Sequence, residues 1–126
     1  MRHIESNIQK QCVQWFTLQF PDIRPLFFAV GNGGARRRVE AAIMKGEGVT
    51  AGVADIIMLY PNKRYHGLCI EFKTKTGRQS ESQKLFQRKV ERAGYRYIII
   101  RDIENFIREV KAYIYNTDEP ENPENA

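Results

Sequence analysis

Apolar residues recur at helical spacing near both ends of the 126-residue chain. From Ile4 to about Phe20 they lie three or four positions apart, and Pro21 then ends the pattern, which predicts an amphipathic helix. After Asp102, a residue type that caps helices, a second stripe predicts a last helix that reaches about residue 115. The stripes consist of Ile4, Ile8, Cys12, Trp15 and Phe16 in the first helix and of Ile103, Phe106, Ile107, Val110 and Ile114 in the last.

Four strands are predicted between these helices. Residues 25–30 form a short aromatic run typical of a first, buried strand. Residues 52–59 and 68–73 are joined by turn residues, so they predict an antiparallel hairpin. Residues 95–100 predict a fourth strand, and a helix over residues 80–93 connects it to the hairpin. A strand reached through such a helix is expected to run parallel to its predecessor, with a right-handed crossover.

A glycine-rich break at residues 31–34 leads into Arg36, Arg37 and Arg38 and a short predicted helix that ends near residue 45. Arginines at the start of a helix oppose its dipole, so they cost stability unless an anion lies near them. A DNA phosphate would supply that anion, and the glycines would let the backbone approach it closely. Neither GxGxxG nor GK[ST] is complete here, so a nucleotide-binding loop is not indicated.

The order of elements predicts an α/β protein with a central mixed β-sheet flanked by helices. We expect one compact domain over residues 1–115, because this length supports one core, and a disordered acidic tail over residues 116–126. The sequence has no run of 18 apolar residues and no signal-peptide pattern, which predicts a cytoplasmic protein without a membrane partner. Cys12 and Cys69 lack metal-ligand spacing and are expected to be reduced core residues.

Charge is unevenly divided along the chain. The whole sequence has 20 basic and 15 acidic residues, a net charge of +5. Residues 116–126 hold four acids and no base, so residues 1–115 keep 20 bases against 11 acids, a charge of +9. This surplus predicts a polyanionic partner, first of all nucleic acid. The alternative is a soluble basic protein without such a partner.

Three charged residues fall within the apolar hairpin, where charge is unexpected. A period of two places Glu71 and Lys73 on the same face of their strand, and Asp55 interrupts the apolar run of the other. Buried carboxylates need a cationic partner or a metal. Two of them suit Mg²⁺ or Mn²⁺, which would make a water more acidic for phosphodiester hydrolysis, with the lysine orienting that water. The alternative is an ion pair between Glu71 and Lys73 that supports the hairpin.

The short motif E-x-K carries little information by itself, because it occurs twice in this chain. Glu109 and Lys111 form the second copy within the predicted last helix, where residues two apart face different directions. Gln83 lies three residues after Ser80, a capping-box spacing that explains the glutamine without catalysis. Glu5 likewise has an ordinary explanation, as a carboxylate near the positive end of a helix dipole.

Taken together, these motifs resemble the VRR-NUC domain, a branch of the PD-(D/E)XK nuclease superfamily with a restriction-endonuclease-like fold. The resemblance covers residues 1 to about 114 and depends on the order and spacing of several loose motifs. The chain departs from the family pattern at Ala54, where a proline usually precedes the metal-binding aspartate. The motifs are Glu5, Asn32-Gly33-Gly34, Gly48-Val49-x-x-Gly52-Val53-Ala54-Asp55, Glu71-Phe72-Lys73 and Gln79-Ser80-x-x-Gln83.

The resemblance implies a metal-dependent DNA endonuclease. It implies that Asp55, Glu71 and the backbone carbonyl of Phe72 bind Mg²⁺ or Mn²⁺, that Lys73 assists the water, and that Glu5 and Gln83 complete the site, with Glu5 as a further ligand. Small stand-alone members, from bacteria and phages, are similar to Holliday-junction resolvases and act as homodimers on branched DNA. The expected DNA-binding residues are Asn32, Arg36, Arg37, Arg38, Lys75 and Arg78.

Two alternatives stay open on the sequence. A basic module that binds nucleic acid without cleaving it would need the charge but no metal. A nuclease for flaps or other repair intermediates would share the site but prefer another DNA structure. The sequence contains no base-reading motif, which favours recognition of DNA shape and backbone, and it does not distinguish one bound metal from two.

Overall fold

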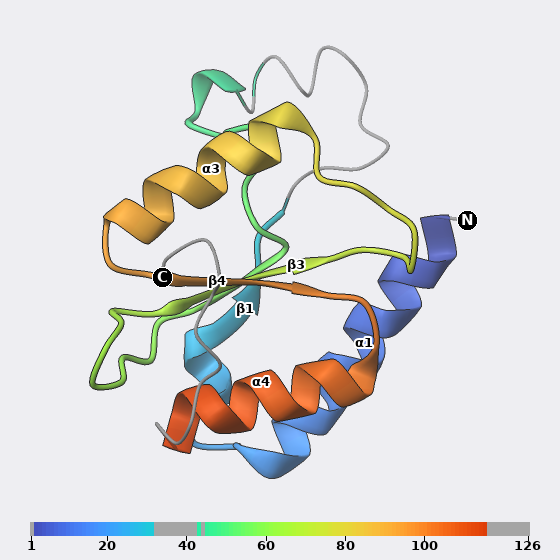
Figure 1. Ribbon diagram of the computed structural model, residues 1–126, viewed down its shortest axis with the longest axis vertical. Helices are drawn as coiled ribbons and strands as arrows, with labels where there is room; N and C mark the ends of the chain where they lie inside the picture. Colours follow the sequence, from blue (N-terminus) through green and yellow to red (C-terminus); the bar gives the residue numbers. More distant parts are fainter. Residues whose placement is uncertain (1, 32–42, 44, 116–126) are drawn as a thin grey trace.

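A four-stranded mixed sheet lies at the centre of the computed structural model, which describes residues 2–31, 43 and 45–115 (Figure 1). The strand order is β1-β2-β3-β4. The first two pairs are antiparallel and β3 runs parallel to β4, so the predicted hairpin and the predicted parallel crossover are confirmed. The strands are β1 (Phe27–Ala29), β2 (Ile56–Met58), β3 (Leu68–Phe72) and β4 (Arg96–Ile100).

Helices cover both faces of this sheet, which confirms the predicted α/β architecture. In Figure 1, α1 (Arg2–Gln19) and α4 (Ile103–Tyr115) lie on one side of the strands, and α3 (Glu81–Arg92) lies on the other. A short 3₁₀ helix, Arg24–Leu26, leads into β1. The apolar stripes predicted from the sequence supply the buried contacts of α1 and α4, which include Cys12, Phe16, Phe106 and Val110.

Strand β3 is buried along its whole length between these helical layers. Leu68, Ile70 and Phe72 belong to the larger core, which they share with α1 and α4. Cys69 packs in the smaller cluster, to which α3 contributes, and Glu71 shares its face because side chains alternate along a strand. The fold therefore carries a carboxylate into the layer between the sheet and α3.

The first strand differs from the prediction that it would be buried. Only Phe27 is buried, whereas Phe28 is 40% exposed. The reason is topological, because β1 lies at one edge of the sheet. The charged residues of the hairpin also lie just outside the regular strands, since β2 begins one residue after Asp55 and β3 ends one residue before Lys73.

Some predictions concern residues that the structure does not describe. The predicted acidic tail over residues 116–126 and most of the predicted helix over residues 39–45 are among them, so the domain boundary at residue 115 stays a prediction. Both cysteines are free and buried, as expected. Within the described ranges, no helix has the length and apolar character that crossing a bilayer requires.

Candidate active site

Asp55 is held in place by backbone hydrogen bonds to both neighbouring strands. Its carbonyl accepts from the N–H of Val30 at 2.8 Å, and its own N–H donates to the carbonyl of Ile70 at 3.0 Å. The carboxylate oxygen Oδ2 accepts a further bond of 2.7 Å from the N–H of Phe72. The side chain of Asp55 is therefore fixed beside the end of β3, next to Glu71.

Glu71 is fully buried, and its two carboxylate oxygens have different surroundings. Oε1 accepts hydrogen bonds from Nε2 of Gln79, at 3.0 Å, and from the hydroxyl of Tyr97. Oε2 has no hydrogen-bond partner and lies 3.7 Å from Nζ of Lys73. This contact is the ion pair that the sequence left open as an alternative. Because a buried oxygen without a hydrogen bond is costly, Oε2 depends on a cation beside it.

The surroundings of Asp55 disfavour its charged form. Burial raises the pKa of Asp55 above its ordinary value, and the negative charges of Glu71 and Glu5 raise it further. The hydrogen bond from Phe72 and the positive charge of Lys73 act in the opposite direction. Burial also raises the pKa of Tyr97, as does its bond to Glu71, so the phenol stays a hydrogen-bond donor. A divalent cation between the carboxylates would remove their repulsion.

The oxygen atoms of this site fit a hard divalent metal. Asp55 and Glu71 supply carboxylates, and unpartnered Oε2 of Glu71 is available as a ligand. In the part of the chain that the structure describes, no three His, Cys, Asp or Glu side chains are grouped closely enough to hold a metal. Glu5, in the first turn of α1, affects Asp55 through charge. The ligand roles of Glu5 and of the Phe72 carbonyl stay predictions.

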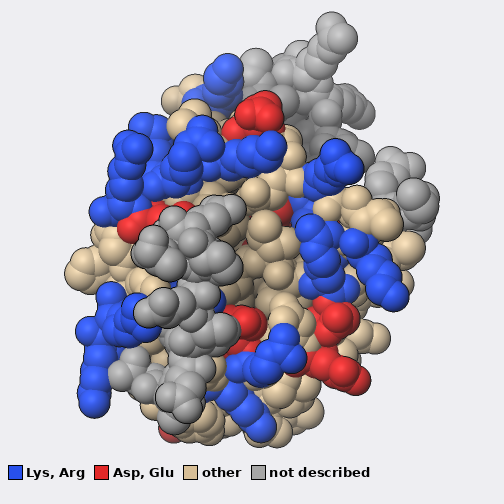
Figure 2. Space-filling model, in the orientation of Figure 1, with Lys and Arg blue, Asp and Glu red and all other residues tan. Residues whose placement is uncertain are grey.

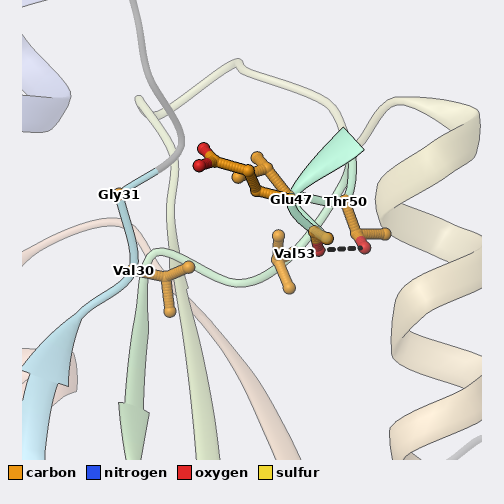
Figure 3. A pocket seen from close by; sticks show the side chains of 7 residues that line it. Val30, Gly31, Glu47, Thr50 and Val53 are labelled. Carbon is orange, nitrogen blue, oxygen red and sulfur yellow. Dashed lines mark hydrogen bonds between the residues drawn. The ribbon is translucent and has the colours of Figure 1, made fainter. Parts of the chain in front are cut away.

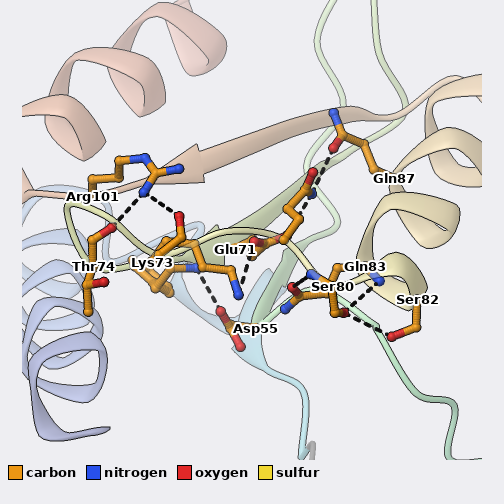
Figure 4. A network of polar contacts seen from close by, with 12 residues as sticks. Asp55, Glu71, Lys73, Thr74, Ser80, Ser82, Gln83, Gln87 and Arg101 are labelled. Carbon is orange, nitrogen blue, oxygen red and sulfur yellow. Dashed lines mark hydrogen bonds and ion pairs between the residues drawn. The ribbon is translucent and has the colours of Figure 1, made fainter. Parts of the chain in front are cut away.

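Sequence reasoning missed the residues that hold Glu71. Gln79 donates to Oε1 of Glu71 and also to Oε1 of Gln87, which in turn donates to Glu91 (Figure 4). Tyr97 reaches Glu71 from β4, where the residue paired with Glu71 is Ile99. Because residues two apart on a strand share a face, the parallel crossover already placed a tyrosine beside this carboxylate.

Gln83 forms the predicted capping box at the start of α3. Its Oε1 accepts from the N–H of Ser80 at 2.8 Å, and its own N–H donates to Oγ of Ser80 at 3.2 Å. The amide group Nε2 makes no hydrogen bond to any described residue. Capping therefore uses Oε1 of the side chain and leaves the donor Nε2 available for another contact.

Replacing Gln83 with alanine separates these two roles when it is compared with Ser80→Ala. Each variant loses one hydrogen bond of the capping box, so each is expected to lose about 1 kcal/mol of stability in thermal denaturation. If Nε2 of Gln83 also donates to the substrate, Gln83→Ala alone should lower the cleavage rate, by about tenfold. Equal cleavage rates in the two variants would show that Gln83 acts only as a helix cap.

Arg101 holds the loop between β3 and α3. Its Nη1 donates to the carbonyls of Thr74 at 2.6 Å, Gly77 at 2.9 Å and Lys75 at 3.3 Å. This loop begins at Lys73 and ends at the glutamine that binds Glu71 (Figure 4). One guanidinium therefore fixes the segment that carries both neighbours of the buried carboxylate.

The predicted DNA-binding residues divide into two groups. Lys75 and Arg78 are exposed on the loop that Arg101 holds, close to Lys73 along the chain. Asn32, Arg36, Arg37 and Arg38 lie outside the described residues. The two described residues of the set thus lie on the loop that follows Lys73, and the roles of all six residues stay predictions.

A hollow of about 360 Å³ opens beside this site, between the end of β1 and the segment that leads to Asp55 (Figure 3). The side chain of Glu47 points into it, and none of the described residues that line it is basic. The same segment contains Gly52, where φ is +84° and a Cβ would lie 2.5 Å from the backbone of Ser82. Glycine lets this segment pack against the first turn of α3. The hollow is lined by Val30, Gly31, Glu47, Gly48, Val49, Thr50 and Val53.

The second E-x-K copy, Glu109 and Lys111, makes other contacts than Glu71 and Lys73. Glu109 forms an ion pair of 3.3 Å with Arg96, and Lys111 lies over the ring of Trp15 at 6.0 Å. Both residues belong to α4, which lies on the opposite face of the sheet from α3. The prediction that this copy cannot form the same site is confirmed.

Comparison with known proteins gives one consistent result. A family model for the VRR-NUC domain matches residues 2–101. A solved structure of a VRR_NUC domain protein has a TM-score of 0.79 and 26% sequence identity, and the alignment covers 91% of each chain. None of the curated proteins matches the chain. The matched region contains every element that forms the site, from α1 to the end of β4.

Proposed function

The chain belongs to the VRR-NUC domain family, and from that premise we propose that it is an endonuclease that uses Mg²⁺ or Mn²⁺ to cleave branched DNA. Membership makes it a nuclease domain with DNA as its substrate. The observation that carries the metal-dependent reaction is Oε2 of Glu71, which is fully buried, has no hydrogen-bond partner and lies beside Asp55. A protein that only bound DNA would gain little from two acids facing phosphate.

In this proposal the residues of the site divide the work of hydrolysis. Asp55, Glu71 and the carbonyl of Phe72 would hold the metal, with Glu5 as a further carboxylate. A metal there supplies an acidic water and offsets negative charge on the phosphoryl oxygens. Nζ of Lys73, 3.7 Å from Glu71, orients the attacking water and stabilises the anionic transition state.

The hydrogen bonds around Glu71 support this division. Gln79 and Tyr97 both donate to Oε1, so the carboxylate cannot rotate freely and Oε2 stays directed toward Lys73. Ligands held by surrounding hydrogen bonds keep their orientation when the metal binds. Arg101, which holds the adjoining loop through three carbonyls, keeps Lys73 in reach of the same oxygen.

We further propose that the chain acts as a homodimer on four-way junctions. One such domain offers one active site, whereas resolving a junction needs paired cuts on two strands. Two sites related by a twofold axis would meet this requirement. Analytical ultracentrifugation with and without a junction would detect the dimer.

Cleavage of a panel of DNAs tests the proposed function. The panel contains a four-way junction, a flap, a splayed arm and a linear duplex, each incubated with Mg²⁺, with Mn²⁺ or with EDTA. We expect nicking of the junction with either metal, none in EDTA, and recovery when metal is added back, because the carboxylates need a cation to act.

The other outcomes of the panel have definite meanings. Preferential cleavage of the flap would show that the flap, rather than the junction, is the preferred substrate, and it would leave the site assignment intact. Binding that weakens steeply with salt, with no nicking under any metal condition, would overturn the enzymatic proposal in favour of a binding module.

A further inference from the structure

The outer face of α3 carries four basic side chains that the site does not use. Phe86 and Val90 turn the opposite face of the helix into the core beneath it. The outer side chains are spaced mostly four residues apart, so they lie one above the other along the helix axis. We call them the α3 stripe, and they are Lys84, Arg88, Lys89 and Arg92, all exposed.

Most of this charge is not balanced by the residues that the structure describes. Lys84 pairs with Glu81 at 3.4 Å, but Arg88, Lys89 and Arg92 form no ion pair with any described residue. The helix dipole favours cations in the last turn, which accounts for Lys89 and Arg92 and leaves Arg88 unexplained. Figure 2 shows Lys and Arg side chains gathered over the part of the surface that α3 occupies in Figure 1.

The stripe starts at the active site and runs away from it. Helix α3 begins one residue after Ser80, and Gln79 before it binds Glu71. With 12 residues, the helix extends about 18 Å at 1.5 Å per residue. Along a DNA duplex this length corresponds to about five base pairs.

We propose that the α3 stripe binds the phosphate backbone of a duplex arm, within about five base pairs of the bond that is cleaved. This inference deepens the proposed function and rests on it for the identity of the ligand. Duplex DNA fits better than an acidic protein, because protein interfaces have an apolar or aromatic centre. The outer face of α3 offers only Leu85, which is 48% exposed.

Contacts to phosphate alone also agree with shape-based recognition. Arginine and lysine side chains that reach the backbone set the register of the protein on DNA without reading bases. The stripe would thus orient the arm so that the scissile phosphate meets the carboxylates. The stripe would contact phosphates together with Lys75 and Arg78, which lie on the loop between Lys73 and the helix.

A triple variant that replaces three basic residues with uncharged glutamine tests this inference, with DNA binding as the only measurement. Arg88→Gln, Lys89→Gln and Arg92→Gln are combined, and Lys84 is kept because it pairs with Glu81. Affinity for a fluorescent four-way junction is measured by anisotropy in EDTA over a range of salt concentrations. Each lost phosphate contact lowers the slope of log affinity against log salt by about 0.9, so we expect a reduction of about two to three.

A second triple variant controls for net charge. Lys10→Gln, Arg108→Gln and Lys111→Gln remove the same three charges from α1 and α4, on the other face of the sheet. We expect its salt slope to stay near that of the wild-type protein. Equal slopes in the two triple variants would overturn the inference, because binding would then depend on charge in general.

Two further measurements complete the test. Arg88→Lys combined with Arg92→Lys keeps the charge, so its salt slope should stay near that of the wild-type protein, and circular dichroism of the glutamine triple variant checks that its helices are intact. Shortening one junction arm, closed by a hairpin loop so that it stays paired, to fewer than about five base pairs should weaken DNA binding by the wild-type protein and leave that of the glutamine triple variant unchanged. Since cleavage is not measured, failure of this inference is distinguishable from failure of the enzymatic proposal, which the metal-dependent panel tests.

Discussion

Asp55→Asn is expected to lower the rate of junction cleavage by on the order of 10³-fold while the protein stays folded. The substitution removes a negative charge that the proposed metal needs. It keeps a side-chain oxygen, which can still accept the 2.7 Å bond from the N–H of Phe72. Since burial raises the pKa of Asp55, the folded protein already disfavours the charged form.

The rate loss should therefore occur without loss of stability. In EDTA at neutral pH, the unfolding temperature of the variant is expected to equal or exceed that of the wild-type protein, because a desolvated charge has been removed. Asp22→Asn is the matched control, since Asp22 is exposed in the turn after α1. Single-turnover cleavage and thermal denaturation of both variants provide the measurement. Cleavage by Asp55→Asn at the wild-type rate would refute the assignment of this carboxylate.

Lys73→Met is expected to lower cleavage by about 10²-fold to 10³-fold, whereas Lys111→Met leaves it unchanged. The two lysines occupy the same position in the two E-x-K copies, which makes them a matched pair. Lys73 is 13% exposed and lies 3.7 Å from the unpartnered oxygen of Glu71. Lys111 is exposed and contacts Trp15 on the opposite side of the sheet.

Stability measurements separate a catalytic lysine from one that only balances charge. Removing Lys73 leaves Glu71 buried without a cation, which should destabilise the metal-free protein by about 3 kcal/mol. Added Mg²⁺ would replace the missing charge and recover that stability. If cleavage recovered together with stability, Lys73 would be a structural ion-pair partner; we expect cleavage to stay low.

Local patterns were enough to predict most of the regular structure. The stripes of α1 and α4 and the alternation in β3 follow from residues close together in sequence, because backbone geometry sets their periods. The crossover rule then made β4 parallel to β3, as observed. The prediction that β1 would be buried was wrong, because an edge position depends on the order of all four strands rather than on the composition of one.

The active site was only partly predictable, because its chemistry combines segments far apart in sequence. Alternation put Glu71 and Lys73 on one face, and the capping pattern anticipated the bonds of Gln83. The contacts of Gln79 and Tyr97 with Glu71 depend on how the loop and β4 meet the end of β3. Strand alternation and the parallel crossover place Tyr97 on the face of Glu71, but no spacing in the sequence expresses the contact of Gln79.

The amino-acid sequence by itself determined the helices, the hairpin, the basic character of the chain and the set of acids and lysine that resembles a nuclease. The sequence already set the copy at Glu109 and Lys111 apart, because it lies in a predicted helix, and only the tertiary structure showed how fully Glu71 is buried and which groups surround it. Glu71 is fully buried, and its Oε2 faces Lys73 without a hydrogen bond, whereas Glu109 is paired with Arg96. The physical reason is that the cost of a buried charge depends on every group packed around it, and those groups come together only when the chain folds.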